Sequence, residues 1–368
     1  MHTIELKIKD IAFGGKGVGR DGGGKAVFIP FTIEGETVAA DIVREKKQFT
    51  EAEVVEIRQP SPHRVAPPCP YFGRCGGCAY QHADYAHQLE IKWRQVRDLL
   101  QRIGKIANPP MRPIIASPES YGYRNRITVH VQNDVIGFFR RESNRLIDIE
   151  NCLISTAAVN TELKRLRQSA PGDGHYTLRP SEGPRIFGQT NNEVAEILRK
   201  LVVEMVPVGQ NLLIDAYCGA GFFAKALLEK FERVVGIDWD RFAIEEARRT
   251  ANPKEIYVDD DVEEMLISRS GGFPTAELKP PAVENRRSLT IIVDPPATGL
   301  TSGTRKAIID LVPTTLIYVS CNPATLARDL KDLTAHFTLT SVTPLDMFPQ
   351  TAEIEVVAQL TGPVAAEP

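Results

Sequence analysis

An alternation of strand-like and helix-like segments from about residue 186 onward constrains the fold more than any other feature of this chain. Apolar runs typical of buried strands are NLLIDA, RVVGID, EIYVD, LTIIVD and TTLIYVS, and helical segments such as AKALLEKF and FAIEEARR lie between them. A repeat of this kind folds into a doubly wound sheet, whose ligands bind at the carboxyl ends of the strands. We therefore expect a multidomain α/β protein, with the chemistry of residues 186–368 gathered at one sheet edge.

Residues 1–60 follow a different pattern, in which short strand-like segments are separated by glycine-rich turns and no long helical period appears. This pattern predicts a small β-barrel of the five-stranded oligonucleotide-binding type. The segment GGKGVGRDGGGK is not a phosphate loop, because no GKS or GKT follows and no helix begins after it. We expect a β-turn there, with Lys16, Arg20 and Lys25 near its tip. The proline-rich linker PSPHRVAPPCP closes this unit.

The middle of the chain, residues 61–185, contains three closely spaced cysteines in CPYFGRCGGC. Three thiols leave one unpaired in any disulfide scheme, and MHTIELKIKD lacks the apolar core of a secretory leader. Ligation of a metal ion or of an iron–sulfur cluster is the better interpretation, and it requires a fourth ligand. The isolated Cys152 is the natural candidate, although a lone cysteine is usually a small buried apolar residue.

Charge and hydropathy limit the possible partners without naming one. The net charge of −3 gives no argument for nucleic acid, and no apolar run approaches the roughly 20 residues of a membrane span. Residues 88–126 carry eight Lys or Arg against three Asp or Glu. Apolar residues recur at helical spacing over 85–103, with Lys92 and several arginines on other faces, so a solvated helix face is favoured over RNA binding as the explanation of this charge.

The turn after the first strand of the α/β half suggests a nucleoside ligand. Gly219 and Gly221 in DAYCGAGFF would let the backbone approach a ligand, and Asp238 ends the next strand, where a carboxylate suits ribose hydroxyls. Asp261, after a third strand, could reach an adenine amino group. The full glycine pattern of a dinucleotide site is absent, and S-adenosylmethionine is the common ligand that needs less. A plain α/β turn remains the alternative.

Two later strand ends point to chemistry. VDPPATGL carries Asp294, and VSCNPATL carries Cys321 on a loop between Ser320 and Asn322. A thiol in that position can be kept accessible and its pKa lowered, as a nucleophile requires, whereas Cys218 within the glycine turn is a packing residue. From the residues alone, a structural role for Cys321 is equally compatible.

Taken together, these motifs resemble the RNA uracil-C5 methyltransferases, which make 5-methyluridine in ribosomal or transfer RNA, in the branch with a TRAM domain and an iron–sulfur cluster. The resemblance runs through GGKGVGR, CPYFGRCGGCAYQH, YGYRNRITV, ENC, FGQTNN, DAYCGAGFF, DPPATGL, SCNP and FPQTAEIE, and so covers nearly the whole chain. It implies a TRAM barrel of the OB type over 1–60, a central α+β iron–sulfur and RNA-binding domain over 61–185, and a Rossmann-like class I methyltransferase domain over 186–368.

The resemblance also implies a role for individual residues. Cys69, Cys75, Cys78 and Cys152 would hold one [4Fe-4S] cluster as an organiser of the fold, with a zinc site on the same thiolates as the alternative. Cys321 would add to uracil C6 as the nucleophile, and Glu355 would remove the C5 proton after methyl transfer. Asp294 would position the cofactor and the uracil. The expected cofactor-binding residues are Gln189, Tyr217, Gly219, Gly221, Phe222, Asp238, Asp261 and Asp294.

Three positions depart from the family's usual pattern. Ala297 replaces an arginine after DPP, Glu353 replaces a histidine two residues before the base, and Phe222 replaces a small polar residue. The alternatives are therefore an RNA-binding homologue without methyltransferase activity, a cytosine-C5 methyltransferase and a redox protein. The expected partner is RNA, with ribosomal RNA favoured over tRNA, and the expected state is a cytoplasmic monomer with no membrane association.

Overall fold

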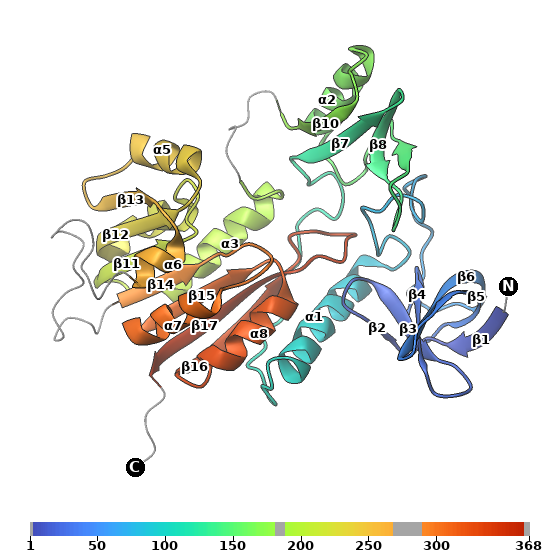
Figure 1. The fold of residues 1–368 in the computed structure, drawn as a ribbon, viewed down its shortest axis with the longest axis horizontal. Helices are drawn as coiled ribbons and strands as arrows, with labels where there is room; N and C mark the ends of the chain where they lie inside the picture. The colour runs from blue at the N-terminus through green and yellow to red at the C-terminus, as the bar shows by residue number, and fades with distance from the viewer. Residues whose placement is uncertain (1–2, 181–187, 268–288, 364–368) are drawn as a thin grey trace.

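The structure is a computed structural model that describes residues 3–180, 188–267 and 289–363. Figure 1 shows three sheets, with the barrel at the lower right, a four-stranded sheet at the upper right and a seven-stranded sheet on the left. The helix α1 (Tyr85–Arg102) lies between the barrel and the seven-stranded sheet. The expected boundary between residues 185 and 186 lies outside the described residues.

The N-terminal sheet has the order β1-β5-β6-β4-β3-β2. Its strands are β1 (Thr3–Lys7), β2 (Asp10–Ile11), β3 (Lys16–Arg20), β4 (Ala26–Pro30), β5 (Thr37–Glu45) and β6 (Phe49–Gln59). Only two residues separate β1 from β2, yet β1 pairs with β5 and β2 pairs with β3 at the other end of the order. One bent strand therefore joins the two ends, and the sheet curls into a barrel of five strands when β1 and β2 are taken together.

The barrel does not bury its core alone. Its apolar cluster includes Ile8, Val27 and Ile29, and it also includes Tyr80 and Ile91 from the middle of the chain. Both of these residues are at most 2% exposed. The barrel is therefore packed against the middle of the chain through a shared apolar cluster.

The four-stranded antiparallel sheet has the order β10-β7-β8-β9. Its elements are β7 (Ile127–Gln132), β8 (Val135–Phe139), β9 (Leu146–Asp148), α2 (Ala157–Gln168) and β10 (Gly174–Leu178). Alternate residues of β7 are buried, as expected for a strand with one face on a core, and Val159 and Leu163 of α2 pack against that face. The cysteine-bearing residues 69–78 and 152 lie beside this sheet, where Cys75 forms an isolated bridge with Arg140.

The helix predicted over 85–103 is present, but its buried face differs from the expected one. Lys92 was expected on a solvated face, and it is instead completely buried, in line with Gln88 and Val96. The reason is that α1 is covered on two sides. Val96, Leu99 and Leu100 pack into the core of the seven-stranded sheet, while Ile91 contacts the barrel.

The doubly wound sheet expected from the strand–helix repeat is confirmed. Its strands are β11 (Gln210–Ala216), β12 (Phe231–Asp238), β13 (Glu255–Asp259), β14 (Leu289–Val293), β15 (Thr315–Ser320), β16 (Phe337–Leu345) and β17 (Glu355–Pro363). Their order is β13-β12-β11-β14-β15-β17-β16, and only the pairings of β17 are antiparallel. The helices are α3 (Asn192–Met205), α4 (Phe222–Leu227), η1 (Leu228–Lys230), α5 (Arg241–Arg249), α6 (Val262–Ile267), α7 (Ser302–Leu311) and α8 (Pro323–Leu333).

One apolar cluster covers each face of this sheet. The strands β14 and β15 are buried along their whole length, which is typical of parallel strands covered on both faces. The functional strand ends are thereby fixed on a rigid support. Over the described residues, no helix combines the length and the apolar character that crossing a membrane requires.

Candidate active site

The carboxyl edge of the seven-stranded sheet collects most of the residues singled out in the sequence. Asp238 ends β12, Tyr217 follows β11, and Asp294 follows β14. Tyr217 donates its backbone N–H to Ile237 at 2.8 Å, and Asp294 donates its own to Ala216 at 3.3 Å, so the loops continue the strand register. The parallel topology therefore brings these side chains to one edge, as the strand pattern predicted.

Cys321 and Glu355 face each other across two antiparallel strands. Ser320 of β15 pairs with Val356 of β17, and one step further along the register Cys321 comes opposite Glu355. Because β17 runs against its neighbours, its first residue lies at the edge where β14 and β15 end. Asp294 follows β14, Cys321 follows β15 and Glu355 begins β17, so the three residues occupy three successive strands of one edge. Adjacent strands of a sheet are about 4.8 Å apart.

Hydrogen bonds join the loop after β14 to the loop after β15. The carbonyl of Ala297 accepts from the side-chain amide of Asn322 at 3.0 Å and from the hydroxyl of Thr325 at 3.1 Å. Asn322 is also the N-cap of α8 and accepts from the backbone N–H of Ala324 at 3.1 Å. The position of Cys321 relative to Asp294 is thus set by α8.

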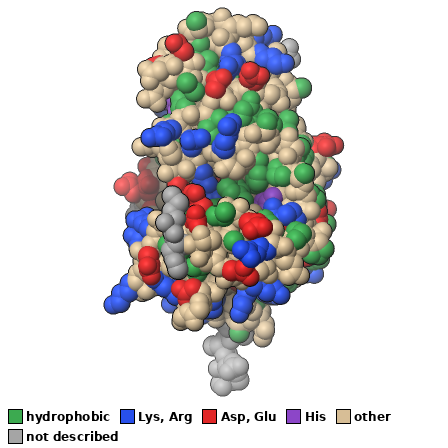
Figure 2. All heavy atoms as spheres, turned by 90° about the vertical axis from the view of Figure 1, so that its right-hand side faces the viewer, with side chains coloured by type: hydrophobic (Ala, Val, Ile, Leu, Met, Phe, Trp, Pro, Cys, Tyr) green, Lys and Arg blue, Asp and Glu red, His purple; other side chains and the backbone are tan. Residues whose placement is uncertain are grey.

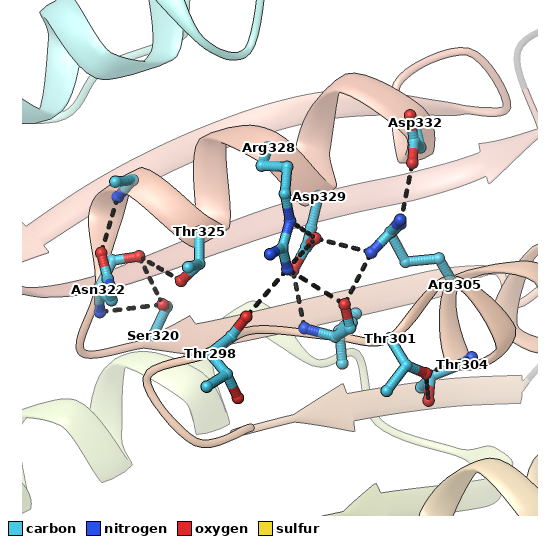
Figure 3. A network of polar contacts seen from close by, with 12 residues as sticks. Thr298, Thr301, Thr304, Arg305, Ser320, Asn322, Thr325, Arg328, Asp329 and Asp332 are labelled. Carbon is cyan, nitrogen blue, oxygen red and sulfur yellow. Dashed lines mark hydrogen bonds and ion pairs between the residues drawn. The ribbon is translucent and has the colours of Figure 1, made fainter.

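The buried Asp329 strengthens this connection from beneath. It is fully buried and accepts hydrogen bonds from Tyr318 at 2.7 Å, from the backbone N–H of Leu300 at 2.8 Å and from Arg305 at 2.9 Å. Arg328 binds Asp329 and also donates to the carbonyl of Thr298 at 3.0 Å (Figure 3). Sequence reasoning missed this network, because its members are scattered over residues 298–329 and Asp329 at its centre lies outside the quoted motifs.

Carboxylates dominate the electrostatics of the edge. Burial, and next the neighbouring Asp238, raise the pKa of Asp294 to about 7. Burial, and next the charge of Asp294, raise the pKa of Glu355 well above its ordinary value. Asp294 and Glu355 are therefore held partly or wholly protonated in the free protein.

The thiol of Cys321 differs from the expectation in one respect. A lowered pKa was expected from its loop position, whereas burial and the carboxylates of Glu355 and Asp294 raise it to about 12. The side chain is half-buried, so it remains reachable. The free protein therefore favours the neutral thiol of Cys321, because burial and neighbouring acids oppose its ionisation.

The glycine-rich turn binds Asp238 directly. The backbone N–H of Gly219 donates to one carboxylate oxygen of Asp238 at 2.7 Å, and that of Asp240 donates to the other at 2.8 Å. A side chain added at Gly219 would meet nothing within 4 Å, which leaves its open side for a ligand. Gly221 serves packing instead, since a Cβ there would lie 2.5 Å from the hydroxyl of Tyr257.

The remaining predicted residues are less central. Asp261 is exposed and accepts from the backbone N–H of Glu264 at 3.0 Å, as a cap of α6. Phe222 begins α4 and packs edge-on against Phe223. Gln189 accepts from the Asn125 amide at 2.9 Å through its backbone carbonyl. The described contacts place neither Gln189 nor Phe222 at the carboxylates of the edge.

Side chains two residues apart on a strand share one face, which predicts that Glu353 would lie beside Glu355, and this prediction is wrong. β17 begins at Glu355, so Glu353 lies before the strand and is exposed, whereas Glu355 is only 2% exposed. The two carboxylates therefore have different environments.

Asp215 is a buried acid that sequence reasoning passed over. It lies in β11 with no exposed surface, and one of its oxygens accepts from the backbone N–H of Ala224 at 2.8 Å. Burial, and next the charges of Asp294 and Asp238, raise its pKa to about 8. Its place in the DAYCGAG motif could have drawn attention to it.

A separate cavity of about 560 Å³ is lined by all four cysteines of the middle region, Cys69, Cys75, Cys78 and Cys152. None of them is in a disulfide. Burial raises the pKa of the Cys78 thiol to about 12, and the other three thiolates add to the shift. Asn160 fixes Cys152 by bonding both its backbone N–H and its carbonyl, at 2.9 and 3.0 Å. Four thiols around one cavity, whose wall also includes Arg124 and Arg126, form a donor set suited to an iron–sulfur cluster.

The four thiols are not drawn together around one point. Across the described part of the chain, no three Cys, His, Asp or Glu side chains come close enough together to hold one metal ion. Tetrahedral zinc needs all its sulfurs at about 2.3 Å from one point.

The basic residues of 88–126 do not form one surface. Lys92 is buried, Arg94 pairs with Glu34, and Arg97 pairs with Asp98 at 2.9 Å. In the barrel, Lys16 at the start of β3 is also paired with an acid, Glu51, at 3.0 Å. Figure 2 shows acidic and basic side chains interspersed over the lower part of the face it presents. Lys92, Arg94 and Arg97 are therefore buried or paired with acids, and they do not form one basic patch.

Comparisons with known proteins agree with this arrangement. Residues 172–361 match the family model tRNA (Uracil-5-)-methyltransferase, and residues 2–55 match the TRAM domain. An RNA methyltransferase from Gloeobacter violaceus is 30% identical over 98% of this chain and 96% of its own length. One from Bdellovibrio bacteriovorus is 31% identical over 97% and 94%.

One solved structure resembles the whole chain. It is the tRNA (uracil-54, C5)-methyltransferase of Pyrococcus abyssi, in complex with S-adenosyl-L-homocysteine. It is 24% identical, has a TM-score of 0.70, and the match covers 97% of this chain and 100% of that one. At this identity the likeness establishes the shared fold.

Proposed function

This chain belongs to the tRNA (uracil-5-)-methyltransferase family, and we propose that it forms 5-methyluridine in ribosomal RNA through a covalent intermediate on Cys321. It is an S-adenosylmethionine-dependent RNA (uracil-C5)-methyltransferase. The observation that carries the proposed mechanism is the register of β15 and β17, in which Cys321 stands opposite the buried Glu355 with Asp294 on the next strand.

The reaction needs a nucleophile because C5 of uracil is too weakly nucleophilic to attack a methyl group unaided. The Cys321 thiol gives up its proton to solvent, its sulfur forms a bond to C6, and the electron pair of the C5–C6 double bond moves to C5 and O4 as an enolate. C5 then takes the methyl group, and the carbon–sulfur bond of the donor breaks. Asp294 and the Gly219 turn hold the reactants in line for this displacement.

Elimination completes the cycle. Glu355 accepts the proton on C5, and the electron pair of the broken C5–H bond re-forms the C5–C6 double bond. The sulfur of Cys321 then leaves C6 as a thiolate. Glu355 suits this step because its pKa is raised well above the ordinary value, so it holds a proton firmly. Glu353 is exposed and lies before the strand, which makes it a poorer candidate.

The charges of the site change in step with the reaction. S-adenosylmethionine enters as a sulfonium cation and leaves as a neutral thioether. Neighbouring carboxylates oppose the ionisation of Asp294, Glu355 and the Cys321 thiol. A bound sulfonium cation would favour the ionised forms of all three groups. Once the positive charge is gone, the proton affinity of Glu355 rises again. That is the moment at which the C5 proton must be removed.

The middle region is proposed to hold a [4Fe-4S] cluster through Cys69, Cys75, Cys78 and Cys152. When bound, such a cluster has every iron occupied by one thiolate and serves as a cross-link between distant segments. In this chain it would join residues 69–78 to Cys152 beside the four-stranded sheet. Anaerobically purified protein should be brown and contain about four irons per chain, whereas about one zinc would support the alternative.

The test of the function is methyl transfer from labelled S-adenosylmethionine to purified ribosomal RNA and, in parallel, to tRNA. Label in 5-methyluridine of ribosomal RNA supports the proposal. Label only in tRNA would show that tRNA is the substrate instead. Incorporation into neither RNA would favour an RNA-binding homologue that has lost activity. The target uridine must leave its stack to reach Cys321, so unfolded transcripts are the first substrates to try. We expect the protein to act in the cytoplasm, as a monomer.

A further inference from the structure

The segment that carries Glu355 is held from outside the seven-stranded sheet. Residues 346–354 form the connection between β16 and β17, and this connection reaches away from the sheet toward the middle of the molecule (Figure 1). Two residues of α1, Lys92 and Gln88, bind it. Both are at most 1% exposed.

Lys92 uses every proton of its ammonium group on this connection. Its Nζ donates to the carboxylate of Asp346 at 2.6 Å, to the carbonyl of Phe348 at 3.0 Å and to the carbonyl of Glu353 at 3.0 Å. These acceptors lie at the beginning, the middle and the end of the connection. One buried cation therefore fixes the whole segment just before Glu355.

Gln88 adds a second attachment. Its side-chain amide donates to the Gln350 side chain at 3.0 Å, and its oxygen accepts from the backbone N–H of Gln350 at 3.2 Å. Gln350 is 2% exposed and has a φ of 69°, a left-handed conformation that a residue with a side chain seldom adopts. The backbone N–H groups of Ala79 and Tyr80, directly after Cys78, also donate to its carbonyl, at 2.9 and 3.0 Å.

We propose that the Lys92–Asp346 pair positions Glu355 for proton removal, so that the middle region of the chain, and not the methyltransferase sheet alone, sets the geometry of the elimination step. This inference rests on the proposed function. A buried ion pair is weak evidence for stability, because apolar or neutral residues of similar size often replace one without loss. Three bonds from one ammonium to the segment that leads into Glu355 point to a positioning role.

The test removes the charges in pairs. In Lys92→Met combined with Asp346→Asn, neither partner is left as a lone buried charge, but the anchors on Phe348 and Glu353 are lost. The matched control is Arg64→Met with Glu36→Gln, which neutralises another pair with a fully buried carboxylate, far from β17 in sequence. Urea denaturation checks that both variants are folded.

Single-turnover reactions with labelled S-adenosylmethionine then separate methyl transfer from RNA release. We expect the first variant to release methylated RNA about 10- to 100-fold more slowly and to accumulate the covalent adduct, with methyl-donor affinity within a few-fold of wild type. Hydrogen exchange should quicken in residues 346–353. The control should release RNA at the wild-type rate.

Wild-type release by a folded Lys92→Met, Asp346→Asn variant would overturn the inference and leave the proposed function intact. If that variant does not fold, Gln88→Met carries the test, with the same expected delay and the same contrary result. Wild-type protein that transfers no methyl group would instead overturn the proposed function, and the inference with it.

Discussion

The side-chain amide of Asn322 donates a 3.0 Å hydrogen bond to the main-chain carbonyl of Ala297. This bond joins the loop that carries the nucleophile candidate Cys321 to the loop that carries Asp294. It uses the backbone of Ala297, so the loss of the arginine that the family usually has at this position leaves the connection between the loops in place. The electrostatic contribution of that arginine is missing, and the site is correspondingly rich in carboxylates.

Replacing Cys321 with alanine should reduce turnover to background, because no other group can add to C6. Cofactor affinity should stay within a few-fold of wild type, since the thiol acts on RNA. Cys218→Ala is the matched control, because Cys218 is the other cysteine of this half and is buried in the core. Methylation by Cys321→Ala at a rate near wild type would contradict the assignment.

Replacing Glu355 with glutamine should stop the reaction after methyl transfer and before release. The amide keeps the shape of the side chain but cannot accept the C5 proton, so a covalent protein–RNA adduct that carries the labelled methyl group should accumulate. Denaturing gels detect this adduct directly. Glu353→Gln is the control and should turn over without accumulating adduct. An adduct from that variant alone would transfer the role of base to Glu353.

The reactivity of the Cys321 thiol should depend on the charge of the bound cofactor analogue. With its pKa raised to about 12, the thiol should react slowly with iodoacetamide at pH 7.5 in the free protein. An analogue with an amine in place of the sulfonium should accelerate alkylation, because its positive charge stabilises the thiolate. S-adenosylhomocysteine has a similar shape without that charge and should not. Equal rates with both analogues would count against the charge argument.

Asp215 should make the free protein less stable as the pH rises. Its pKa in the folded state is raised to about 8 from the ordinary 3.8, so the folded state binds this proton more tightly than the unfolded state. The resulting stabilisation is complete below about pH 3.8 and is lost as the pH rises through about 8. Asp215→Asn should therefore raise the free energy of unfolding by more at pH 8.5 than at pH 5.

Asp148→Asn supplies a control of opposite sign for this experiment. The pKa of Asp148 is lowered, first by its hydrogen bonds from Arg167, so its contribution is present at neutral pH and is lost as the pH falls. Urea midpoints measured from pH 3 to 8.5 compare the two variants, since the contribution of Asp148 changes only below about pH 4. An Asp215→Asn protein with the wild-type pH dependence would show that Asp215 is ionised in the folded state.

The sequence by itself determined the strand ends of the catalytic half. Asp238, Asp294 and Cys321 each follow an apolar run, and parallel strands place such residues at one edge whatever else the chain does. The four cysteines were likewise recognisable as a set from their spacing. Both inferences depend on local patterns, which the chain carries in every conformation.

Only the tertiary structure decided which charged residues are buried and what surrounds them. Lys92 follows the same helical pattern as a solvated residue, and it is buried because Asp346, 254 positions away, supplies its partner. The loop position of Cys321 predicts an activated thiol with a lowered pKa. Its pKa is raised instead, because the thiol is buried and the register of β17 brings Glu355 opposite it. Burial and electrostatic environment are set by segments distant in sequence, so no local pattern specifies them.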